Sequence, residues 1–110
     1  MEINHAIAAL GALAQETRLD VFRYLVAAGG TDVAAGRIAR DLGVPPATLS
    51  FHLNQLKHAG LVTCRKNGRS MLYGADFDGL DRLMGYLTEN CCRGACGTGR
   101  LAFDKGATRT

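Results

Sequence analysis

Three cysteines lie close together near the end of this 110-residue chain, at Cys91, Cys92 and Cys96. Three thiolates form a soft donor set, which favours thiophilic ions over hard ions that prefer oxygen. Structural zinc usually has four protein ligands, whereas trivalent arsenic or antimony has a lone pair and is satisfied by three sulfurs. The ligand count therefore favours a trivalent metalloid. The identity of the ion is left open between arsenite, antimonite and a methylated arsenical. A methylated arsenical could be held by only two thiols.

The spacing of these cysteines restricts the geometry of such a site. Neighbouring helical residues project about 100° apart, so Cys91 and Cys92 cannot both face one ion while a helix stays regular. The site is expected where the last helix ends, with Gly94 letting Cys96 fold back within the same subunit. A reversible Cys92–Cys96 disulfide of a redox sensor and a structural zinc or inert role are the alternatives. Cys64, far along the chain, is expected to be a small core residue.

Composition and charge limit the class of protein. The chain is 47% hydrophobic, long enough for one domain and too short for a large enzyme with a deep pocket. Its start has no basic leader and no apolar run spans a bilayer, so a cytoplasmic protein with reduced thiols and no membrane partner is expected. Residues 35–75 carry a net charge of +5, against −2 for residues 1–34 and zero for residues 76–110. Such a basic middle segment favours a phosphate-bearing partner.

Three amphipathic helices are predicted outside the basic segment. The first two run from Ile3 and from Thr17, and the last follows an N-cap at Asp76 or Asp78. Their apolar stripes are Ile3, Ile7, Leu10 and Leu13; Leu19, Phe22, Leu25 and Val26; and Phe77, Leu80, Leu83, Met84 and Leu87. Apolar helices at both ends of so small a chain indicate a two-fold dimer interface formed by the first and last helices.

The basic segment predicts a helix-turn-helix. A short helix with Ile38, Ala39 and Leu42 inward ends at Gly43, and a second helix runs from Pro46 to Gly60. Leu49, Leu53 and Leu56 share the core face of the second helix, and His52 lies beside that face as a packing residue.

The opposite face of this second helix has the side chains that a major-groove reader needs. Asn54 or Gln55 could pair with adenine, and Phe51 could cover thymine methyl groups. The alternative to DNA binding is that this polar face is simply exposed to solvent. The predicted DNA-contacting residues of this helix are Thr48, Ser50, Phe51, Asn54, Gln55 and Lys57.

A β-hairpin follows the second helix. Strand-forming runs over 61–64 and 70–73 flank Asn67-Gly68, a pair that suits a type I′ turn. Arg65, Lys66 and Arg69 surround the turn, so the hairpin is expected to lie as a wing along the DNA backbone and to supply affinity.

These segments resemble the ArsR/SmtB family of winged-helix repressors over roughly residues 3–90, in "LAQETRLDVFRYL", "RIARDLGVPPATLSFHLNQLKHAGLV" and "RKNGRSMLYG". The resemblance implies a homodimer that binds double-stranded operator DNA and leaves it when a toxic metal or metalloid ion binds. Thr48, Ser50, Phe51 and Gln55 match the family's recognition-helix surface, although Phe51 stands where many relatives have arginine. The three cysteines resemble the C-terminal sites of arsenic-responsive members, with a shorter gap before Cys96.

The sequence therefore predicts a mainly α protein with a small β-hairpin, folded as a winged helix-turn-helix homodimer. Residues 1–93 form the domain, and residues 94–110 form a flexible tail that contributes Cys96. The predicted function is a repressor released from operator DNA by trivalent arsenic or antimony on Cys91, Cys92 and Cys96, with a redox-sensing repressor as the alternative. No enzyme, organic cofactor or organic substrate other than a methylated arsenical is expected, because no Cys-x-x-Cys motif opens a helix and no base accompanies the thiols.

Overall fold

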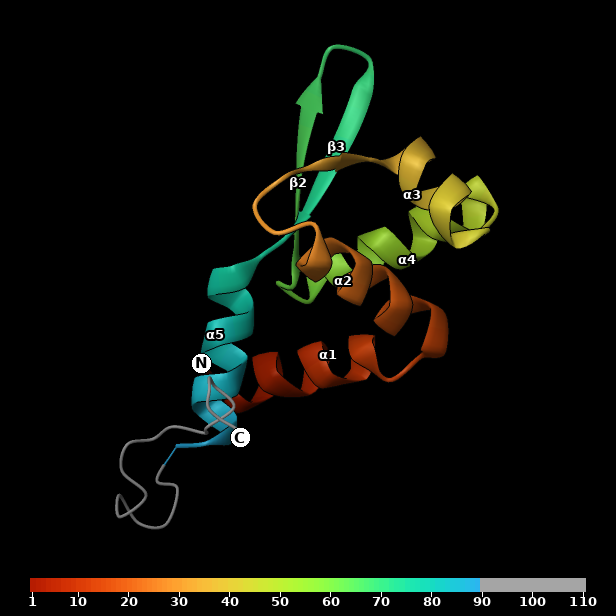
Figure 1. Cartoon of the computed structure of the whole chain (residues 1–110). Coiled ribbons are helices and arrows are strands. Elements are labelled where there is room, and N and C mark those ends of the chain that lie inside the picture. The colour runs from red at the N-terminus through yellow and green to blue at the C-terminus, as the bar shows by residue number, and fades with distance from the viewer. Residues whose placement is uncertain (90–110) are drawn as a thin grey trace.

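The computed structural model describes residues 1–89 of the chain (Figure 1). The predicted winged helix-turn-helix is confirmed, with helices making most of the fold and a long hairpin projecting from it. The end of the predicted domain and the predicted tail over 94–110 lie outside the described residues. The elements are α1 (Ile3–Leu13), α2 (Glu16–Ala27), β1 (Val33–Ala34), α3 (Ala35–Leu42), α4 (Pro46–His58), β2 (Val62–Asn67), β3 (Ser70–Ala75) and α5 (Phe77–Leu87).

The hydrophobic core lies between α2, α3, α4 and the base of the hairpin. Its most deeply buried large side chains are Val21, Leu25, Ile38, Leu49, Leu53, Leu56 and Leu61. The inward faces predicted for α3 and α4 are confirmed at Ile38, Ala39 and the three leucines of α4, which are all buried. Leu42, also predicted to face inward, is only half-buried and packs against this core. The stripe predicted for α2 is wrong at Leu19, which is 41% exposed. Leu19 lies roughly 160° around the helix from Val21, the buried residue that the predicted stripe omitted.

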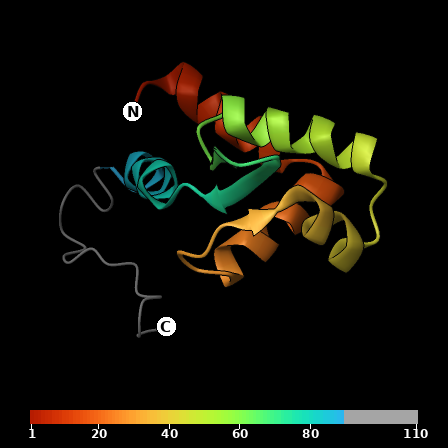
Figure 2. The ribbon, with the colours of Figure 1, turned by 90° about the horizontal axis from the view of Figure 1, so that it is seen from above.

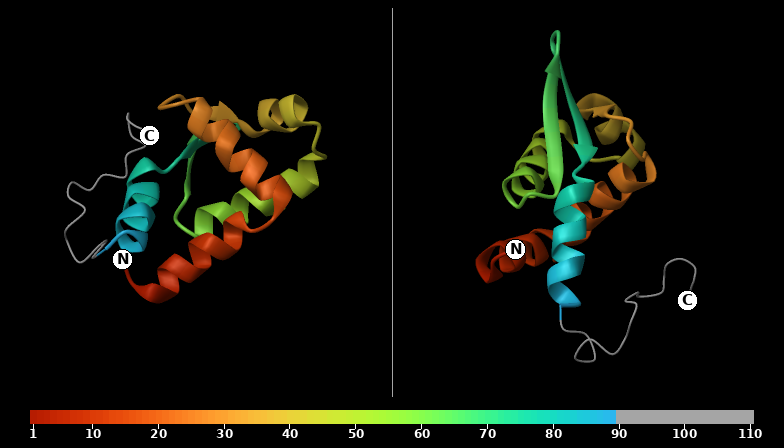
Figure 3. Two further views of the ribbon diagram at one scale, coloured as in Figure 1. Left: turned by 60° about the horizontal axis from the view of Figure 1, so that its bottom comes forward. Right: turned by 90° about the vertical axis from the view of Figure 1, so that its left-hand side faces the viewer.

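Helix α1 packs on the protein through alanine. Ala6, Ala9 and Ala12 are buried, and these small side chains let α1 lie close alongside α4 (Figures 2 and 3). The stripe of larger residues remains on the outside, where Ile3 is 56% and Ile7 60% exposed. The described chain therefore leaves Ile3, Ile7 and Leu10 of the predicted stripe uncovered, whereas Leu13 is half-buried against the core.

The turn between α3 and α4 depends on a left-handed glycine. Gly43 ends α3 with φ 66°, a conformation that glycine adopts without steric cost, and the amide of Val44 donates to the carbonyl of Ala39 at 3.0 Å. Pro46 then begins α4, where its missing amide proton leaves no hydrogen bond unmade. These two features set the angle between the helices.

The hairpin belongs to a three-stranded antiparallel sheet with the order β1-β3-β2. Asn67 pairs with Ser70, so the turn consists of Gly68, with φ 63°, and Arg69. The turn lies one residue later than the predicted Asn67-Gly68 turn, and both strands are longer than predicted. Strand β1 was missed altogether; its two residues join the sheet where Val33 pairs with Tyr73.

Helix α5 starts at the expected cap. The Asp76 carboxylate accepts a hydrogen bond from the amide of Gly79 at 2.9 Å. A Cβ atom on Gly79 would clash with the carbonyl oxygen of Gly60, so this glycine lets α5 pack directly against the end of α4. Leu83 is buried, whereas Met84 and Leu87 are 38% and 51% exposed. Within residues 1–89, no helix has the length and apolar character needed to cross a membrane.

Candidate nucleic-acid interface

Helix α4 separates a buried leucine face from a polar outer face. Leu49, Leu53 and Leu56 are at most 1% exposed, as the sequence predicted. All six residues predicted to contact DNA from this helix lie on its exposed side, namely Thr48, Ser50, Phe51, Asn54, Gln55 and Lys57. The helix can therefore approach another molecule without disturbing the core.

His52 links α4 to the start of α2, and through Arg18 to the end of α1. The residue is 7% exposed, and its Nδ1 lies 3.4 Å from a guanidinium nitrogen of Arg18. The Nε of Arg18 donates to the carbonyl oxygen of Ala12 at 2.8 Å. Burial lowers the pKa of His52 from its ordinary value, and the neighbouring Arg18 charge lowers that pKa further. His52 is thus the packing residue that the sequence predicted.

Phe51 is the one large apolar side chain of α4 that the structure leaves in solvent, at 57% exposure. Its ring meets the His52 ring edge to face, with 5.7 Å between the centroids. Because its neighbour His52 is held by Arg18, this contact limits where the exposed ring can lie. Phe51 therefore offers an apolar surface in a restrained position.

Gln55 lies on a different side of α4 from Ser50. It lines a shallow hollow of about 300 Å³ together with His58, with Arg18 and with Ala8, Gly11 and Ala12 of α1. Ser50 and Lys57 lie on the opposite flank of the outer face, because a helix turns about 100° per residue. The six predicted residues are thus spread across the full width of the exposed face.

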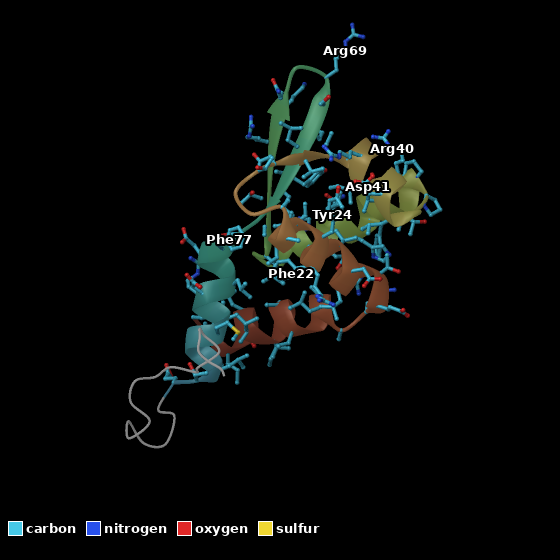
Figure 4. All side chains as sticks on the ribbon, in the orientation of Figure 1. Phe22, Tyr24, Arg40, Asp41, Arg69 and Phe77 are labelled. Carbon is cyan, nitrogen blue, oxygen red and sulfur yellow. The ribbon has the colours of Figure 1, made fainter. Side chains whose placement is uncertain are left out.

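The wing carries its predicted cations in two different environments. Lys66 and Arg69 are exposed, with no carboxylate within ion-pair distance in the described part of the chain. Figure 4 shows the Arg69 side chain at the tip of the hairpin. Arg65, in contrast, makes an ion pair of 2.6 Å with Asp32.

Arg40 belongs to the basic segment but is not among the predicted site residues. Arg40 is exposed on α3, toward the side from which the wing projects (Figure 4). Its neighbour Asp41 accepts a hydrogen bond of 2.6 Å from the Tyr24 hydroxyl and lies 3.6 Å from Arg37. The bond from Tyr24, followed by the charges of Arg37 and Arg40, lowers the pKa of Asp41. Only the charge count signalled Arg40, because its position depends on how α3 sits beside the wing.

The three clustered cysteines, Cys91, Cys92 and Cys96, lie outside the described residues. Cys64 is half-buried on β2 opposite Tyr73, so the expected core position is only partly reached. Burial raises the pKa of Tyr73, and a hydrogen bond with Cys64 raises it further. Among residues 1–89, no group of three cysteine, histidine or acidic side chains is placed to hold a metal ion.

Together, the helix pair, the exposed face of α4 and the basic hairpin define a winged helix-turn-helix of the DNA-binding class. A family model described as a helix-turn-helix domain matches residues 13–65. An ArsR-like transcriptional regulator from Rhodococcus sp. RHA1 has a similar structure, with 30% identity, 77% of each chain covered and a TM-score of 0.69. The chain belongs to the ArsR family of winged-helix regulators.

Two further relatives extend this comparison. The homodimeric winged helix-turn-helix DNA-binding domain of Mb0332 from Mycobacterium bovis is 27% identical, with 78% of this chain and 77% of that chain covered and a TM-score of 0.65. The protein named "Putative arsenical resistance operon repressor ArsR" of Halobacterium salinarum is 39% identical over 67 residues, which are 61% of this chain and 51% of that protein. The chain spans 51% to 63% of the length of the curated relatives it matches.

Proposed function

We propose that this protein is a transcriptional repressor that binds operator DNA as a homodimer and is released by trivalent arsenic or antimony. The observation that carries the DNA-binding part is the exposed polar face of α4 beside the wing cations Lys66 and Arg69, which have no ion-pair partner within residues 1–89. Cations at the wing tip suit phosphate contacts, and the helix face suits the edges of bases in the major groove. The restrained Phe51 ring supplies an apolar contact for thymine methyl groups.

A second copy of the chain is the partner that the apolar surface favours. Ile3, Ile7 and Leu10 of α1 and Met84 and Leu87 of α5 are all exposed. Figures 1 and 3 show α1 and α5 meeting at the end of the molecule away from the wing tip. A two-fold axis through this surface would bury it in both copies and leave both α4 helices exposed. The homodimeric relative from Mycobacterium bovis supports this arrangement.

The cysteine cluster supports a thiophilic inducer. Cys91 follows the last residue of α5, Leu87, by only four positions. The three thiols of Cys91, Cys92 and Cys96 are the number and type of ligand that a trivalent metalloid accepts. The name of the Halobacterium salinarum relative supports an arsenical as the signal.

Release requires that the ion and the DNA favour different arrangements of the dimer. An ion can lower the DNA affinity only if it binds the DNA-incompetent arrangement more tightly. The proximity of the thiols to α5 in the sequence gives a route, because Leu87 belongs to the proposed dimer surface. The coupling free energy in such systems is typically about 1–3 kcal/mol, which is roughly a 5- to 150-fold change in affinity.

A gel-shift assay on operator DNA tests this function. The reduced protein should shift the DNA, and arsenite or antimonite should abolish the shift. Cys91→Ser and Cys92→Ser should keep the DNA bound in arsenite, whereas the control Cys64→Ser should respond as the wild type does. Release by peroxide without any metalloid, with a Cys92–Cys96 linkage in mass spectrometry, would instead establish the redox-sensing repressor. Unaltered release from the Cys91→Ser and Cys92→Ser proteins would refute the proposed site.

A further inference from the structure

The ion pair between Arg65 and Asp32 crosses the middle strand of the sheet. Arg65 is on β2 and Asp32 directly precedes β1, and these two strands are separated by β3. The Nε of Arg65 nevertheless lies 2.6 Å from Oδ2 of Asp32. The side chain of Asp32 is 25% exposed and that of Arg65 is 61% exposed, so the carboxylate is the less exposed partner of the pair.

Gly74 of β3 makes this crossing possible. Gly74 is buried, and a Cβ atom there would overlap Oδ1 of Asp32. Its φ is not positive, so space rather than backbone conformation requires glycine at this position. Thr63, which pairs with Gly74 across the hairpin, donates to the Gly74 carbonyl at 3.3 Å. Because Gly74 has no side chain, the Asp32 carboxylate can occupy the space beside it.

The Arg65–Asp32 pair lies at the level of the hairpin where pairing with β1 ends. Leu72 is flanked on both sides, by Ala34 of β1 and by Arg65 of β2. Beyond this level the hairpin has only its own two strands, through the pairs Lys66–Met71 and Asn67–Ser70. The Arg65–Asp32 pair therefore connects the last three-stranded level of the hairpin to the body of the protein.

We propose that Asp32, Gly74 and Arg65 form a clasp that positions the wing for DNA, with Arg65 acting through Asp32 rather than as a phosphate ligand. This inference rests on the proposed DNA-binding function and changes the role expected for Arg65. Lys66 and Arg69 carry the phosphate contacts of the wing. Arg65 and Asp32 determine the direction in which those two cations are presented.

The salt dependence of DNA binding separates a positioning residue from a phosphate ligand. Each phosphate contact contributes about 0.9 to the slope of log K against log salt concentration. Because the proposed complex contains two copies of the chain, Lys66→Gln and Arg69→Gln should each remove two contacts and reduce the slope by about 1.8. Arg65→Gln should weaken binding, by roughly two- to fivefold for the ion pair lost in each copy of the chain, and leave the slope unchanged. A slope reduced in Arg65→Gln as much as in Lys66→Gln would overturn the proposal.

Gly74→Ala tests the clasp without changing any charge. The added Cβ should displace the Asp32 carboxylate, weaken DNA binding as Arg65→Gln does, and leave the slope unchanged. In the double variant, Arg65→Gln should have almost no further effect. Gly30→Ala is the matched control, because a Cβ there meets nothing within 4 Å. Equal effects of the two glycine variants, or additive effects of Gly74→Ala and Arg65→Gln, would contradict the clasp.

A measurement without DNA keeps the clasp separate from the proposed function. Thermal unfolding of Asp32→Asn, Arg65→Gln and the double variant should show non-additive changes in Tm. If the wild type failed to bind DNA but the Tm changes were still non-additive, the proposed function would be refuted and the clasp would stand. Additive Tm changes would refute the clasp whatever the DNA result.

Discussion

The Tyr24 hydroxyl donates a hydrogen bond of 2.6 Å to the Asp41 carboxylate, which joins α2 to the end of α3 (Figure 4). This bond raises the pKa of Tyr24 and lowers that of Asp41, because it stabilises the protonated phenol and the ionised carboxylate together. The contact fixes the first helix of the helix-turn-helix to the body of the protein, on the side of α3 that also bears Arg40.

Replacing Tyr24 with phenylalanine should lower the urea midpoint of unfolding. The variant keeps the ring and removes only the hydroxyl that binds Asp41, so the loss measures the hydrogen bond. Tyr86→Phe is the matched control, because the Tyr86 hydroxyl makes no hydrogen bond within residues 1–89. Urea unfolding followed by circular dichroism gives both midpoints. Equal midpoints for the two variants would show that the Tyr24–Asp41 bond adds no stability.

The stability of the protein should fall as the pH drops below about 6.5, the ordinary pKa of histidine. Burial, followed by the Arg18 charge, lowers the pKa of His52 in the folded protein. Between the lowered folded pKa and 6.5, the unfolded chain therefore binds a proton that the folded chain resists, and stability rises with pH through this range. Above 6.5 both states are neutral at His52, and its contribution is complete.

His52→Asn should flatten this dependence, since asparagine does not titrate. The free energy of unfolding, measured in urea at several pH values between 5 and 8, should decline less in the variant than in the wild type. His58→Asn, which changes an exposed histidine of the same helix, should keep the decline. An unchanged decline in His52→Asn would assign the acid sensitivity to other groups.

Phe51 and Leu53 should respond in opposite ways to truncation. Phe51→Ala changes an exposed side chain, so its free energy of unfolding should stay within about 0.5 kcal/mol of the wild type. Its operator affinity should fall by roughly 1.5–3 kcal/mol for each half-site, because each copy of the chain would bury one Phe51 ring in the complex. Leu53→Ala creates a core cavity and should cost about 2–5 kcal/mol of stability. Fluorescence anisotropy and urea unfolding measure the two quantities, and unaltered DNA affinity in Phe51→Ala would exclude the ring from the interface.

Ile7→Glu should convert the proposed dimer to a folded monomer. The side chain is 60% exposed on α1, so a charge there leaves the monomer's core intact but would be buried in the two-fold interface. Sedimentation velocity should show the halved mass, with unchanged circular dichroism. Leu19→Glu, which changes a 41% exposed residue of α2, should remain dimeric. Dimers of Ile7→Glu would place the interface elsewhere.

Local sequence patterns predicted the parts of the fold that depend on near neighbours. The leucines of α4 recur at helical spacing, and Gly43 and Asp76 mark helix ends through their own backbone and side-chain chemistry. Strand β1 was beyond such reasoning, because two residues show no alternation and pair only through a partner 40 positions away, Val33 with Tyr73. The exact position of the turn was not predicted either, because Gly68 can be the first or the second central residue of a two-residue turn.

The role of Arg65 shows the same limit at the candidate site. The sequence places three cations around the turn, but it does not show that Asp32, 33 positions earlier, pairs with one of them. The space that Gly74 leaves above β3 exists only once three strands are assembled. The polar face of α4 was predictable because a single helix defines it, whereas the environment of each wing cation depends on the sheet.

The affinity of the dimer for arsenite, measured by calorimetry with and without bound operator DNA, tests the central claim most directly. Coupling between two ligands is reciprocal, so an ion that releases DNA must itself bind more weakly to the DNA-bound dimer, by the same factor. We predict tight binding to the free reduced dimer, weaker binding to the DNA complex, and loss of that difference in Cys91→Ser. Equal arsenite affinities for the free and DNA-bound wild type would contradict release of the DNA by the ion.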